Sequence, residues 1–306
     1  MSKVAIIIVT WNGMKWIEKC LNSIRHSTYP VTVYVVDNKS TDKTPDFIER
    51  TFPEVKLTRS DKNLGFGKAN NLAILQAYNE GNEYFFLLNQ DAYILPNTVA
   101  ELLKVTSSNN DYYIVSPTHL NGDASDVDPY FRDFVLAKCP LYLRNSILNS
   151  GQTLFESDFI PAAAWFLPRR TIETIGGFDP LFYHYGEDDN YCQRCIYHQH
   201  KIVFTTDAYV LHDRLSTVGN KDMYNHKLFF RHLIQDSANI LYTKGFIIQK
   251  LGRQFYDETG LFFMYLLTGK WKSIHNFIKD YMKLLFSINK VIKSRRNNKQ
   301  IHGLTI

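Results

Sequence analysis

Polar side chains that could bind a cation or a nucleotide directly follow apolar runs in the first hundred residues. They offer hydroxyl, amide or carboxylate oxygens and are Thr10, Asn12, Asp37, Asn38, Asn89 and Asp91. Asn89 and Asp91 have the spacing at which one turn presents two oxygens to a hard cation. Magnesium and manganese prefer oxygen ligands and bridge carboxylates to a diphosphate. The pattern therefore indicates a cation site at Asp91, with a strand-terminal turn as the alternative.

The apolar runs alternate with segments of helical periodicity. Strands are predicted over 4–9, 31–36, 55–58 and 84–88, and helices over 14–25, 44–50 and 68–78. Continuously apolar strands separated by helices indicate a mostly parallel sheet with helices on both faces, an α/β fold. In such sheets ligands bind beyond the carboxyl ends of the strands. We therefore expect the polar groups that follow the strands to meet in one crevice.

The chain beyond residue 116 is less regular, and residues 117–160 are interpreted as loop and short elements. Later strands are predicted over 162–167, 202–205 and 209–211, with helices over 171–175 and 188–198. Trp165, in the strand that follows, offers a ring that could stack on a ligand, and core packing is the alternative.

Two further segments could contact a nucleotide. Asp37 could accept hydrogen bonds from a base or ribose, or could simply end its strand in a turn. Residues 63–71 read NLGFGKANN, with two glycines before a helix. A glycine loop that opens a helix can hold a phosphate or ribose. This loop matches neither the Walker pattern nor the Gly-x-Gly-x-x-Gly pattern.

Three adjacent acids, Glu187, Asp188 and Asp189, begin a predicted helix. Crowded carboxylates raise one another's pKa, which suits a general base, and charges complementing the helix dipole are the alternative. His212 ends a strand and could be a further cation ligand or a structural histidine. Cys192 and Cys195 could suggest zinc, but no second ligand pair follows at the usual distance, and the two cysteines are simply three residues apart on a helix.

These motifs occur in a characteristic order. They are IIIVTWN, VVDNKSTD, NLGFGKANN, LLNQD, GGFDPLFYHYGEDDNYCQR and a histidine followed by serine. In this combination the sequence resembles the family 2 inverting glycosyltransferases, and most of all their rhamnosyltransferase-like branch. The resemblance covers about residues 3–217 and implies a GT-A fold, a nucleotide-diphosphate sugar donor and a saccharide acceptor. It also implies Mg²⁺ or Mn²⁺ as the cofactor.

The resemblance also implies residue roles. Asp188 would be the catalytic base with Glu187 beside it, and Asp91 and His212 would hold the metal. The residues implied to contact the nucleotide are Thr10, Asn12, Asp37, Asn63, Gly65, Lys68 and Asn89. Trp165, by stacking on a sugar, and Asp189 would contact the acceptor, and we expect acceptor specificity to lie in residues 117–165. The donor would be dTDP-rhamnose or a UDP-hexose, and the product would enter a bacterial surface polysaccharide.

Two positions depart from the family pattern. Asn89 replaces the first acid of the metal motif, and Asn190 stands where another acid often follows the Glu-Asp pair. Asp188 and Asp189 both stay open as the acid that faces the acceptor. A catalytically inactive nucleotide-sugar-binding protein of the same fold is the alternative function.

The C-terminal segment is basic and amphipathic. Residues 270–299 carry nine lysines and arginines against Asp280 alone, a net +8, whereas the whole chain carries +5. Apolar residues recur at helical spacing: Ile274, Phe277, Ile278, Tyr281, Leu285, Ile288 and Ile292. Residues 270–306 could dock on anionic lipid or pack on the catalytic domain. No nucleic-acid partner is expected, because the body of the chain lacks a basic groove signature.

The expected organisation is a catalytic domain over 1–217, divided into a nucleotide-sugar half, 1–116, and an acceptor half, 117–217. A helical extension follows over 218–306. Four cysteines without a disulfide framework, no signal peptide and no apolar run of about 18 to 20 residues indicate a cytoplasmic protein. The tail would bring it to the inner face of the membrane.

Overall fold

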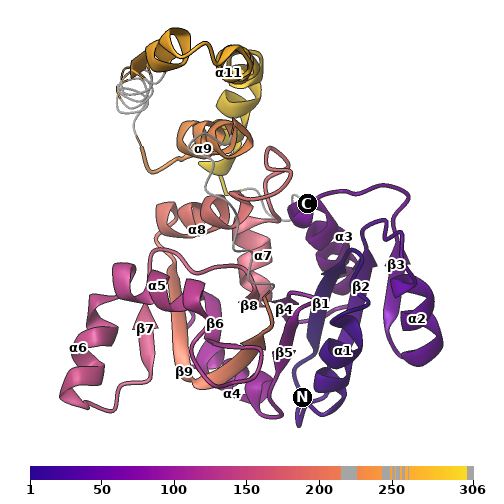
Figure 1. Ribbon diagram of the computed structural model, residues 1–306. Helices are drawn as coiled ribbons and strands as arrows, with labels where there is room; N and C mark the ends of the chain where they lie inside the picture. Colours follow the sequence, from indigo (N-terminus) through magenta and orange to yellow (C-terminus); the bar gives the residue numbers. More distant parts are fainter. Residues whose placement is uncertain are drawn as a thin grey trace. The chain divides into compact units, whose positions relative to one another are not determined.

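The computed structural model describes residues 1–214, 226–242 and 262–301, with single positions at 249, 252, 256, 259 and 260 (Figure 1). The chain forms two compact units that divide between residues 215 and 216. The predicted boundary at 217 and 218 lies outside the described residues.

One mixed sheet organises the first unit, in the strand order β3-β2-β1-β4-β8-β6-β9-β5, with β7 paired to β9. The strands are β1 (Val4–Thr10), β2 (Thr32–Asp37), β3 (Lys56–Arg59), β4 (Tyr84–Leu88), β5 (Ala92–Ile94), β6 (Tyr112–Asn121), β7 (Leu154–Glu156), β8 (Ala164–Pro168) and β9 (Lys201–His212). The first four strands of this order are parallel, as predicted. Strand β8 is antiparallel to both neighbours, and β5 and β7 are antiparallel to β9.

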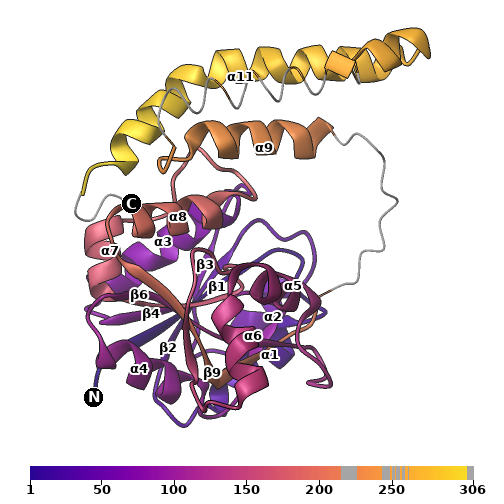
Figure 2. The same ribbon diagram turned by 90° about the vertical axis from the view of Figure 1, so that its left-hand side faces the viewer.

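Helices cover both faces of this sheet, as the continuous apolar strands predicted (Figure 2). One face packs on α1 (Ile17–Arg25), α2 (Thr44–Thr51) and α4 (Thr98–Ser108). The other packs on α3 (Phe66–Asn79), α5 (Pro129–Lys138), α7 (Arg169–Ile175) and α8 (Glu187–Tyr197), while α6 (Pro140–Leu148) lies against α5. Strand β1 shows the reason: Ile7 enters one core, and Ile6 and Ile8 enter the other.

The region 117–160 is more regular than predicted. It contains the end of β6, the helices α5 and α6, and β7. Asp128 caps α5 by accepting a hydrogen bond from the N–H of Phe131 at 2.8 Å. The division predicted between residues 116 and 117 falls inside β6, because one sheet serves both halves.

One other boundary differs from prediction. The strands expected over 202–205 and 209–211 are one strand, β9, whose pairing with β6 shifts register between Pro117 and Thr118. The polar residues that indicated a break lie at this irregularity. Helix α2 begins at Thr44, as predicted, with Lys43 at its N-cap, and the hydroxyl of Thr44 accepts from the N–H of Gly13.

The second unit is helical, as expected for the C-terminal extension. Helices α9 (His226–Ala238) and α11 (Trp271–Asn298) pack together (Figure 2). The guanidinium of Arg295 donates to the carbonyl oxygens of Ser237, Asn239 and Tyr242 at the end of α9. Within the described residues, no helix is both long enough and apolar enough to cross a membrane.

Candidate active site

The polar groups that follow β1, β2 and β4 come together at one edge of the sheet, as predicted. Thr10 and Asp37 are register partners at the ends of β1 and β2, and β4 lies on the other side of β1. Parallel neighbours end at the same edge, so the segment 89–91 that follows β4 lies next to the end of β1.

Gln90 connects the predicted metal loop to β1. Its Oε1 accepts from the hydroxyl of Thr10 at 2.7 Å and from the N–H of Trp11 at 3.0 Å. Its Nε2 donates to the carbonyl of Trp11 at 3.3 Å. A Cβ added at Gly13 would lie 2.5 Å from both Gln90 Oε1 and Thr10 Oγ1, so the close approach requires glycine. Gln90, the middle residue of the Asn-x-Asp motif, therefore ties this segment to the end of β1 and so positions Asp91.

Asn12 and Asp37 connect β1 to the segment after β2. Asn12 Oδ1 accepts from the N–H of Thr41 at 2.8 Å, and its own N–H donates to Ser40 Oγ at 2.9 Å. Asp37 is 3% exposed, and its Oδ2 accepts from the N–H of Ser40 at 3.0 Å. Its Oδ1 is buried with no hydrogen-bond partner in this structure. A buried carboxylate oxygen normally has a donor, so Oδ1 is available to a ligand N–H.

The glycine loop is held by Asn38, which the sequence did not single out for a role of its own. Asn38 Oδ1 accepts from the N–H of Leu64 at 2.6 Å, and its Nδ2 donates to Asn63 Oδ1 at 3.1 Å. Asn63 Oδ1 also accepts from the N–H of Gly65 and from the hydroxyl of Tyr183. Gly65 has φ +79°, and a Cβ there would lie 2.0 Å from the carbonyl oxygen of Tyr183.

This loop opens α3, with Gly65 at its N-cap and Lys68 exposed in its first turn. The nucleotide roles of Asn63, Gly65 and Lys68 stay predictions. What the structure adds is that Asn63 uses its side-chain oxygen to hold the loop.

Asp91 and His212 lie together. His212 Nε2 is 3.4 Å from Asp91 Oδ1, because β5, which begins directly after Asp91, pairs with β9, which ends at His212. Two ligands of one Mg²⁺, with bonds of about 2.1 Å, lie about 3 Å apart, so this pair fits a shared cation. The described residues contain no group of three or more His, Cys, Asp or Glu side chains arranged for a metal. A diphosphate and water would therefore complete the coordination.

Asp128 is the second neighbour of His212. Its Oδ2 lies 3.5 Å from His212 Nδ1, and both side chains are almost fully buried. A carboxylate on the far nitrogen of a metal-binding imidazole orients the ring. Arg214 Nε lies 3.2 Å from Asp128 Oδ2 and donates to His212 Nδ1 at 3.2 Å. Asp128 and Arg214 therefore both contact the same imidazole nitrogen.

Asp188 differs from the other acids with a shifted pKa, because its pKa is raised whereas those of Glu54, Glu80 and Asp123 are lowered. Burial of its carboxyl raises its pKa, and this effect outweighs the nearby backbone N–H groups and the charge of Arg214, which lower it. One of those N–H groups belongs to Asp189, 3.0 Å from Asp188 Oδ1, and another to Ala162, just before β8. The next carbonyl, that of Ala163, accepts from the N–H of Asn89 at 2.9 Å. Asp188 and Asn89 therefore form hydrogen bonds to the backbone of two successive residues, Ala162 and Ala163.

The neighbours of Asp188 differ in exposure. Glu187 is buried at the start of α8, with its Cβ close to Gly67 in the first turn of α3. Asp189 is half-buried. Tyr130, at the start of α5, is about half exposed; burial and the charges of Asp188 and Asp189 raise the pKa of its hydroxyl. The guanidinium of Arg214 lies 4.8 Å from the centre of the Tyr130 ring.

The acceptor-stacking role predicted for Trp165 is wrong. Its side chain is 0% exposed, its Nε1 donates to the carbonyl of Ile160 at 3.2 Å, and its ring packs on Phe178 and Tyr191. Both faces of the apolar strand β8 lie in the core, so the Trp165 ring has no exposed face. Core packing, the alternative stated for this residue, is what the structure has.

The structure adds residues to the site that the sequence analysis missed: Gln90, Asp128, Tyr130 and Arg214. Gln90 is the variable position of a motif, and the others lie in segments without a recognised pattern. The helix start at Asp128 could have been predicted, because Asp followed by Pro is typical of a capped helix N-terminus.

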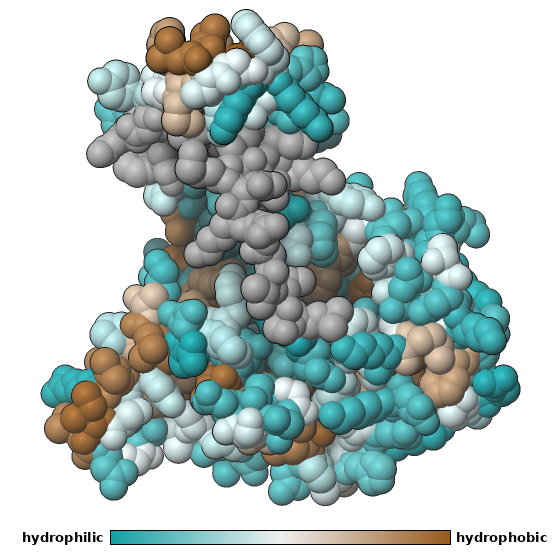
Figure 3. Space-filling model, in the orientation of Figure 1, coloured by the Kyte–Doolittle hydropathy of each residue, from teal (hydrophilic) through white to brown (hydrophobic). Residues whose placement is uncertain are grey.

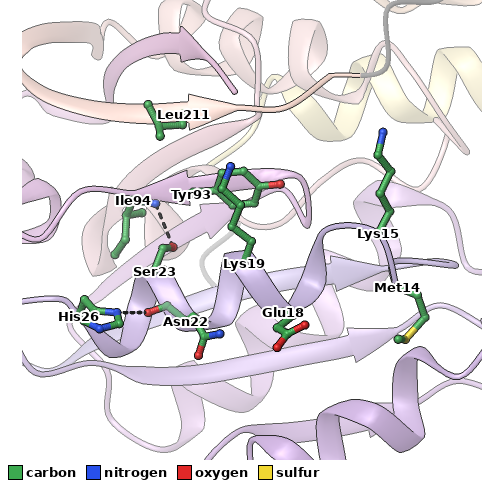
Figure 4. A pocket seen from close by; sticks show the side chains of 10 residues that line it. All are labelled: Met14, Lys15, Glu18, Lys19, Asn22, Ser23, His26, Tyr93, Ile94 and Leu211. Carbon is green, nitrogen blue, oxygen red and sulfur yellow. Dashed lines mark hydrogen bonds between the residues drawn. The ribbon is translucent and has the colours of Figure 1, made fainter. Parts of the chain in front are cut away.

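A separate shallow pocket of about 510 Å³ lies along α1 and β5 (Figure 4). None of the predicted site residues lines it. Ser23 Oγ accepts the N–H of Ile94 at 3.1 Å, which satisfies a donor on the edge strand β5. Lys19 extends over the ring of Tyr93, with its Nζ 4.3 Å from the ring centre. These contacts protect the sheet edge from pairing.

The sheet thus brings oxygen-bearing side chains together at the carboxyl ends of its parallel strands, the edge at which α/β proteins bind ligands. The sequence profile described as Glycosyl transferase family 2 matches residues 5–170. This match covers more than half of the chain, and the chain belongs to that family. The resemblance seen in the motifs is therefore confirmed at the level of the family.

Several curated proteins are similar in sequence. Poly(ribitol-phosphate) beta-N-acetylglucosaminyltransferase TarS of Staphylococcus aureus is 32% identical over 129 residues, 40% of this chain and 22% of TarS. The chain therefore spans about a fifth of that relative. N-acetylglucosaminyl-diphospho-decaprenol L-rhamnosyltransferase of Mycobacterium tuberculosis is 25% identical over 254 residues, 72% of this chain and 79% of the relative. The dTDP-rhamnosyl transferase RfbF of Shigella flexneri is 25% identical over 227 residues, 72% of this chain and 71% of RfbF.

Solved structures share the fold. Residues 1–349 of S. aureus TarS in complex with UDP-GlcNAc superpose with a TM-score of 0.58 at 18% identity, covering 97% of this chain and 89% of that chain. The mannosyltransferase PcManGT of Pyrobaculum calidifontis, in complex with GDP-Man and Mn²⁺, gives a TM-score of 0.56 at 17% identity, covering 97% and 86%. The fold is therefore the GT-A type predicted from the motifs.

Proposed function

We propose that the protein is a metal-dependent inverting glycosyltransferase that moves a rhamnose-like or hexose sugar from a nucleotide-diphosphate donor to a saccharide acceptor. The observation that carries the proposal is the Asp91–His212 pair, 3.4 Å apart, at the sheet edge that also carries Asp188. The pair suits the cation of a bound diphosphate, and Asp188 suits the base for an incoming hydroxyl.

The donors implied by the resemblance, dTDP-rhamnose and a UDP-hexose, fit the nucleotide side. Asp37 Oδ1 is buried without a donor, and both thymine and uracil carry a ring N–H that can supply one. Trp11, directly after Thr10, is half exposed and offers an aromatic face to a base. Asn12, Asn63, Gly65 and Lys68 would complete the pocket.

A bound Mg²⁺ or Mn²⁺ would neutralise negative charge on the departing diphosphate. Asp91 Oδ1 and His212 Nε2 would hold it, which requires the imidazole proton to lie on Nδ1. Asp128 Oδ2, 3.5 Å from that nitrogen, would accept this proton once Arg214 Nε, which donates to the same nitrogen at 3.2 Å, moves away as the cation binds. Asn89 would contribute at most an uncharged oxygen, so Asp91 supplies the carboxylate charge of this motif.

Asp188 would act as the base. A sugar hydroxyl is a weak nucleophile until a carboxylate removes its proton, and a raised pKa brings that carboxylate closer to the operating pH. The acceptor oxygen then bonds to the anomeric carbon as the bond to the diphosphate oxygen breaks. Attack from the face opposite the diphosphate inverts the configuration. Glu187 is buried beside Asp188 and would keep the helix start in place.

On the acceptor side, Tyr130 replaces Trp165 as the aromatic residue that can stack on a sugar. It is 51% exposed and lies within electrostatic range of Asp188 and Asp189. Asp189 would accept a hydrogen bond from an acceptor hydroxyl. The similarity to a rhamnosyltransferase named for a lipid diphosphate acceptor supports a lipid-linked acceptor at the inner membrane face, in surface polysaccharide synthesis.

A thermal-shift panel of UDP, dTDP and GDP, each with and without Mn²⁺, tests the proposal on wild type and Asp91→Ala. We expect one pyrimidine nucleotide to stabilise the wild type in a Mn²⁺-dependent way, and Asp91→Ala to lose that dependence. Asp111→Ala, an exposed acid outside the site, is the matched control. Stabilisation that ignores both metal and mutation would contradict the metal mechanism.

Turnover separates the proposal from its alternative, a nucleotide-sugar-binding protein without catalysis. That protein would show the same nucleotide shifts but would neither transfer sugar to any saccharide acceptor nor hydrolyse the donor.

A further inference from the structure

The C-terminal unit exposes apolar side chains that the sequence pattern did not identify as a group. Six of them are between 45% and 89% exposed: Phe263, Leu267, Trp271, Ile278, Met282 and Phe286. We call these six residues the apolar face. Soluble proteins rarely expose so many large apolar side chains in one small region, and such patches mark interaction sites.

The apolar face is continuous along the helices. Trp271, Ile278, Met282 and Phe286 are spaced by seven, four and four residues and therefore lie on one side of α11. Phe263 and Leu267 are four apart in the helical turn that ends before Gly269, immediately before α11. In Figure 3, apolar surface gathers at the top of this unit.

The stripe predicted from the sequence is divided between two sides of α11. Ile274 and Phe277 are buried, and Phe277 lies 5.5 Å from the ring of Phe262. Ile278, Ile288 and Ile292 are exposed. The buried side also includes charged residues, with Asp280 at 0% exposure and Arg295 bonded to the end of α9. The helix thus packs through both apolar and polar side chains and leaves other apolar side chains outside.

Positive charge surrounds the apolar face. Lys272, Lys279, Lys290 and Lys293 are exposed on α11, and residues 270–299 carry a net +8. A protein partner that buried the face would have to match both an apolar strip and a dense basic border. An anionic lipid surface matches both at once, because acyl chains accept the apolar residues and headgroups pair with lysines. Tryptophan at the start of the face is also typical of the membrane interface.

We infer that the apolar face and its flanking lysines dock the protein on an anionic lipid bilayer, with α11 lying in the plane of the interface. Spanning is not involved, since no described helix could cross a membrane. This docking does not depend on the sugar-transfer mechanism. It would keep the enzyme at a surface that carries lipid-linked acceptors.

Vesicle flotation of the full chain tests the inference. Vesicles of phosphatidylcholine alone are compared with vesicles that also contain phosphatidylglycerol. We expect the wild type to float only with the anionic vesicles and to be released severalfold as ionic strength rises. Trp271→Ser with Phe286→Ser should abolish flotation without unfolding the chain, because both side chains are exposed.

A charge variant and its control make the test specific. Lys279→Gln, Lys290→Gln and Lys293→Gln together should lower the vesicle partition coefficient on the order of a hundredfold, at about 1 kcal/mol per charge. Lys3→Gln, Lys104→Gln and Lys138→Gln remove the same charge from exposed sites of the first unit and should leave binding unchanged.

The inference is overturned if the wild type stays unbound, floats equally with neutral vesicles, or loses binding equally in the control. It is also overturned if light scattering shows a dimer in buffer that the serine variant dissociates, because the face would then join two copies. Donor turnover on a soluble acceptor should be the same in every variant, so failure of docking and failure of the proposed function are distinguishable.

Discussion

The proposed nucleotide side of the site, around Asn12 and Asn38, and its proposed reaction side, around Asp91 and Asp188, are held together by different interactions. On the nucleotide side, neutral side chains bond to neighbouring backbone, as Asn38 does with Leu64 and Asn12 with Thr41. The reaction side gathers charged or titratable groups within 3.5 Å of one another or in electrostatic contact: Asp91, His212, Asp128, Arg214 and Asp188.

This difference follows from the sheet. The nucleotide side uses parallel strands whose ends are adjacent in space and close in sequence. The reaction side uses β9 and the segment before β8, which return from far along the chain. Hydrogen bonds between neutral groups hold the backbone in place at a low desolvation cost. Clustered charges instead shift the pKa of an acid and can hold a cation. We therefore expect changes on the reaction side to lower turnover and metal affinity, and changes on the nucleotide side to lower stability.

Asp188→Asn should have the largest effect. Loss of the base should lower kcat by about 10² to 10⁴, while donor affinity by calorimetry stays close to that of the wild type. Asp189→Asn, with the same chemical change one residue away, is the control and should cost far less. Equal losses in both variants would leave the base unassigned, and a greater loss in Asp189→Asn would assign it to that residue.

The raised pKa of Asp188 also predicts an effect on stability. The folded protein holds this proton more tightly than the unfolded chain, so ionisation costs stability as pH rises above the unfolded pKa of about 3.9. Asp188→Asn removes that cost and should raise the Tm at neutral pH, with no gain at pH below that value. The acid limb of the kcat profile of the wild type should lie above the usual range of an aspartate.

Asp128→Asn should weaken Mn²⁺ binding about 10- to 100-fold, because His212 loses the carboxylate that orients it. Titration of the nucleotide-bound protein with Mn²⁺, followed by calorimetry, measures this directly. Asp126→Asn, exposed two residues away, is the control. Unchanged Mn²⁺ affinity in Asp128→Asn would show that Asp128 serves only to cap α5.

Gly65→Ala tests the nucleotide side. Gly65 and Gly81 have nearly the same φ, +79° and +78°, but only Gly65 has a close neighbour, the carbonyl of Tyr183. Gly81→Ala should lower the free energy of unfolding by about 1 kcal/mol from backbone strain alone. Gly65→Ala should lose a further ~1–3 kcal/mol from overpacking and should also weaken nucleotide binding. Equal losses in urea unfolding would show that the loop tolerates the contact.

Tyr130→Ala should have the smallest effect. Loss of a stacked ring worth about 0.5–1.5 kcal/mol should raise the acceptor KM several-fold with little change in kcat or donor KM. Tyr130→Phe keeps the ring and should retain the acceptor KM of the wild type. If Tyr130→Phe loses as much as Tyr130→Ala, the hydroxyl rather than the ring contacts the acceptor.

The strands and helices of the first hundred residues were predictable because each has a strong local signal. Val4 to Thr10 is apolar on both faces, and α3 follows two glycines with helical periodicity. The segment 117–160 was not predictable in the same way, because Pro117 and His119 interrupt the apolar pattern of β6 and no residue of α6 is buried. Trp165 shows that residue type alone does not determine a role: an aromatic ring can stack on a sugar, but this ring is buried in the core.

The sequence alone determined the fold class, the family and the residue types at the strand ends, because apolar periodicity and motif order are local properties of the chain. Only the tertiary structure decided which groups meet. His212 reaches Asp91 because β9 pairs with β5, and Asp128 reaches His212 because α5 starts beside the end of β9. The apolar face of α11 was also decided in three dimensions, since packing against α9 chose which side of the helix stays exposed.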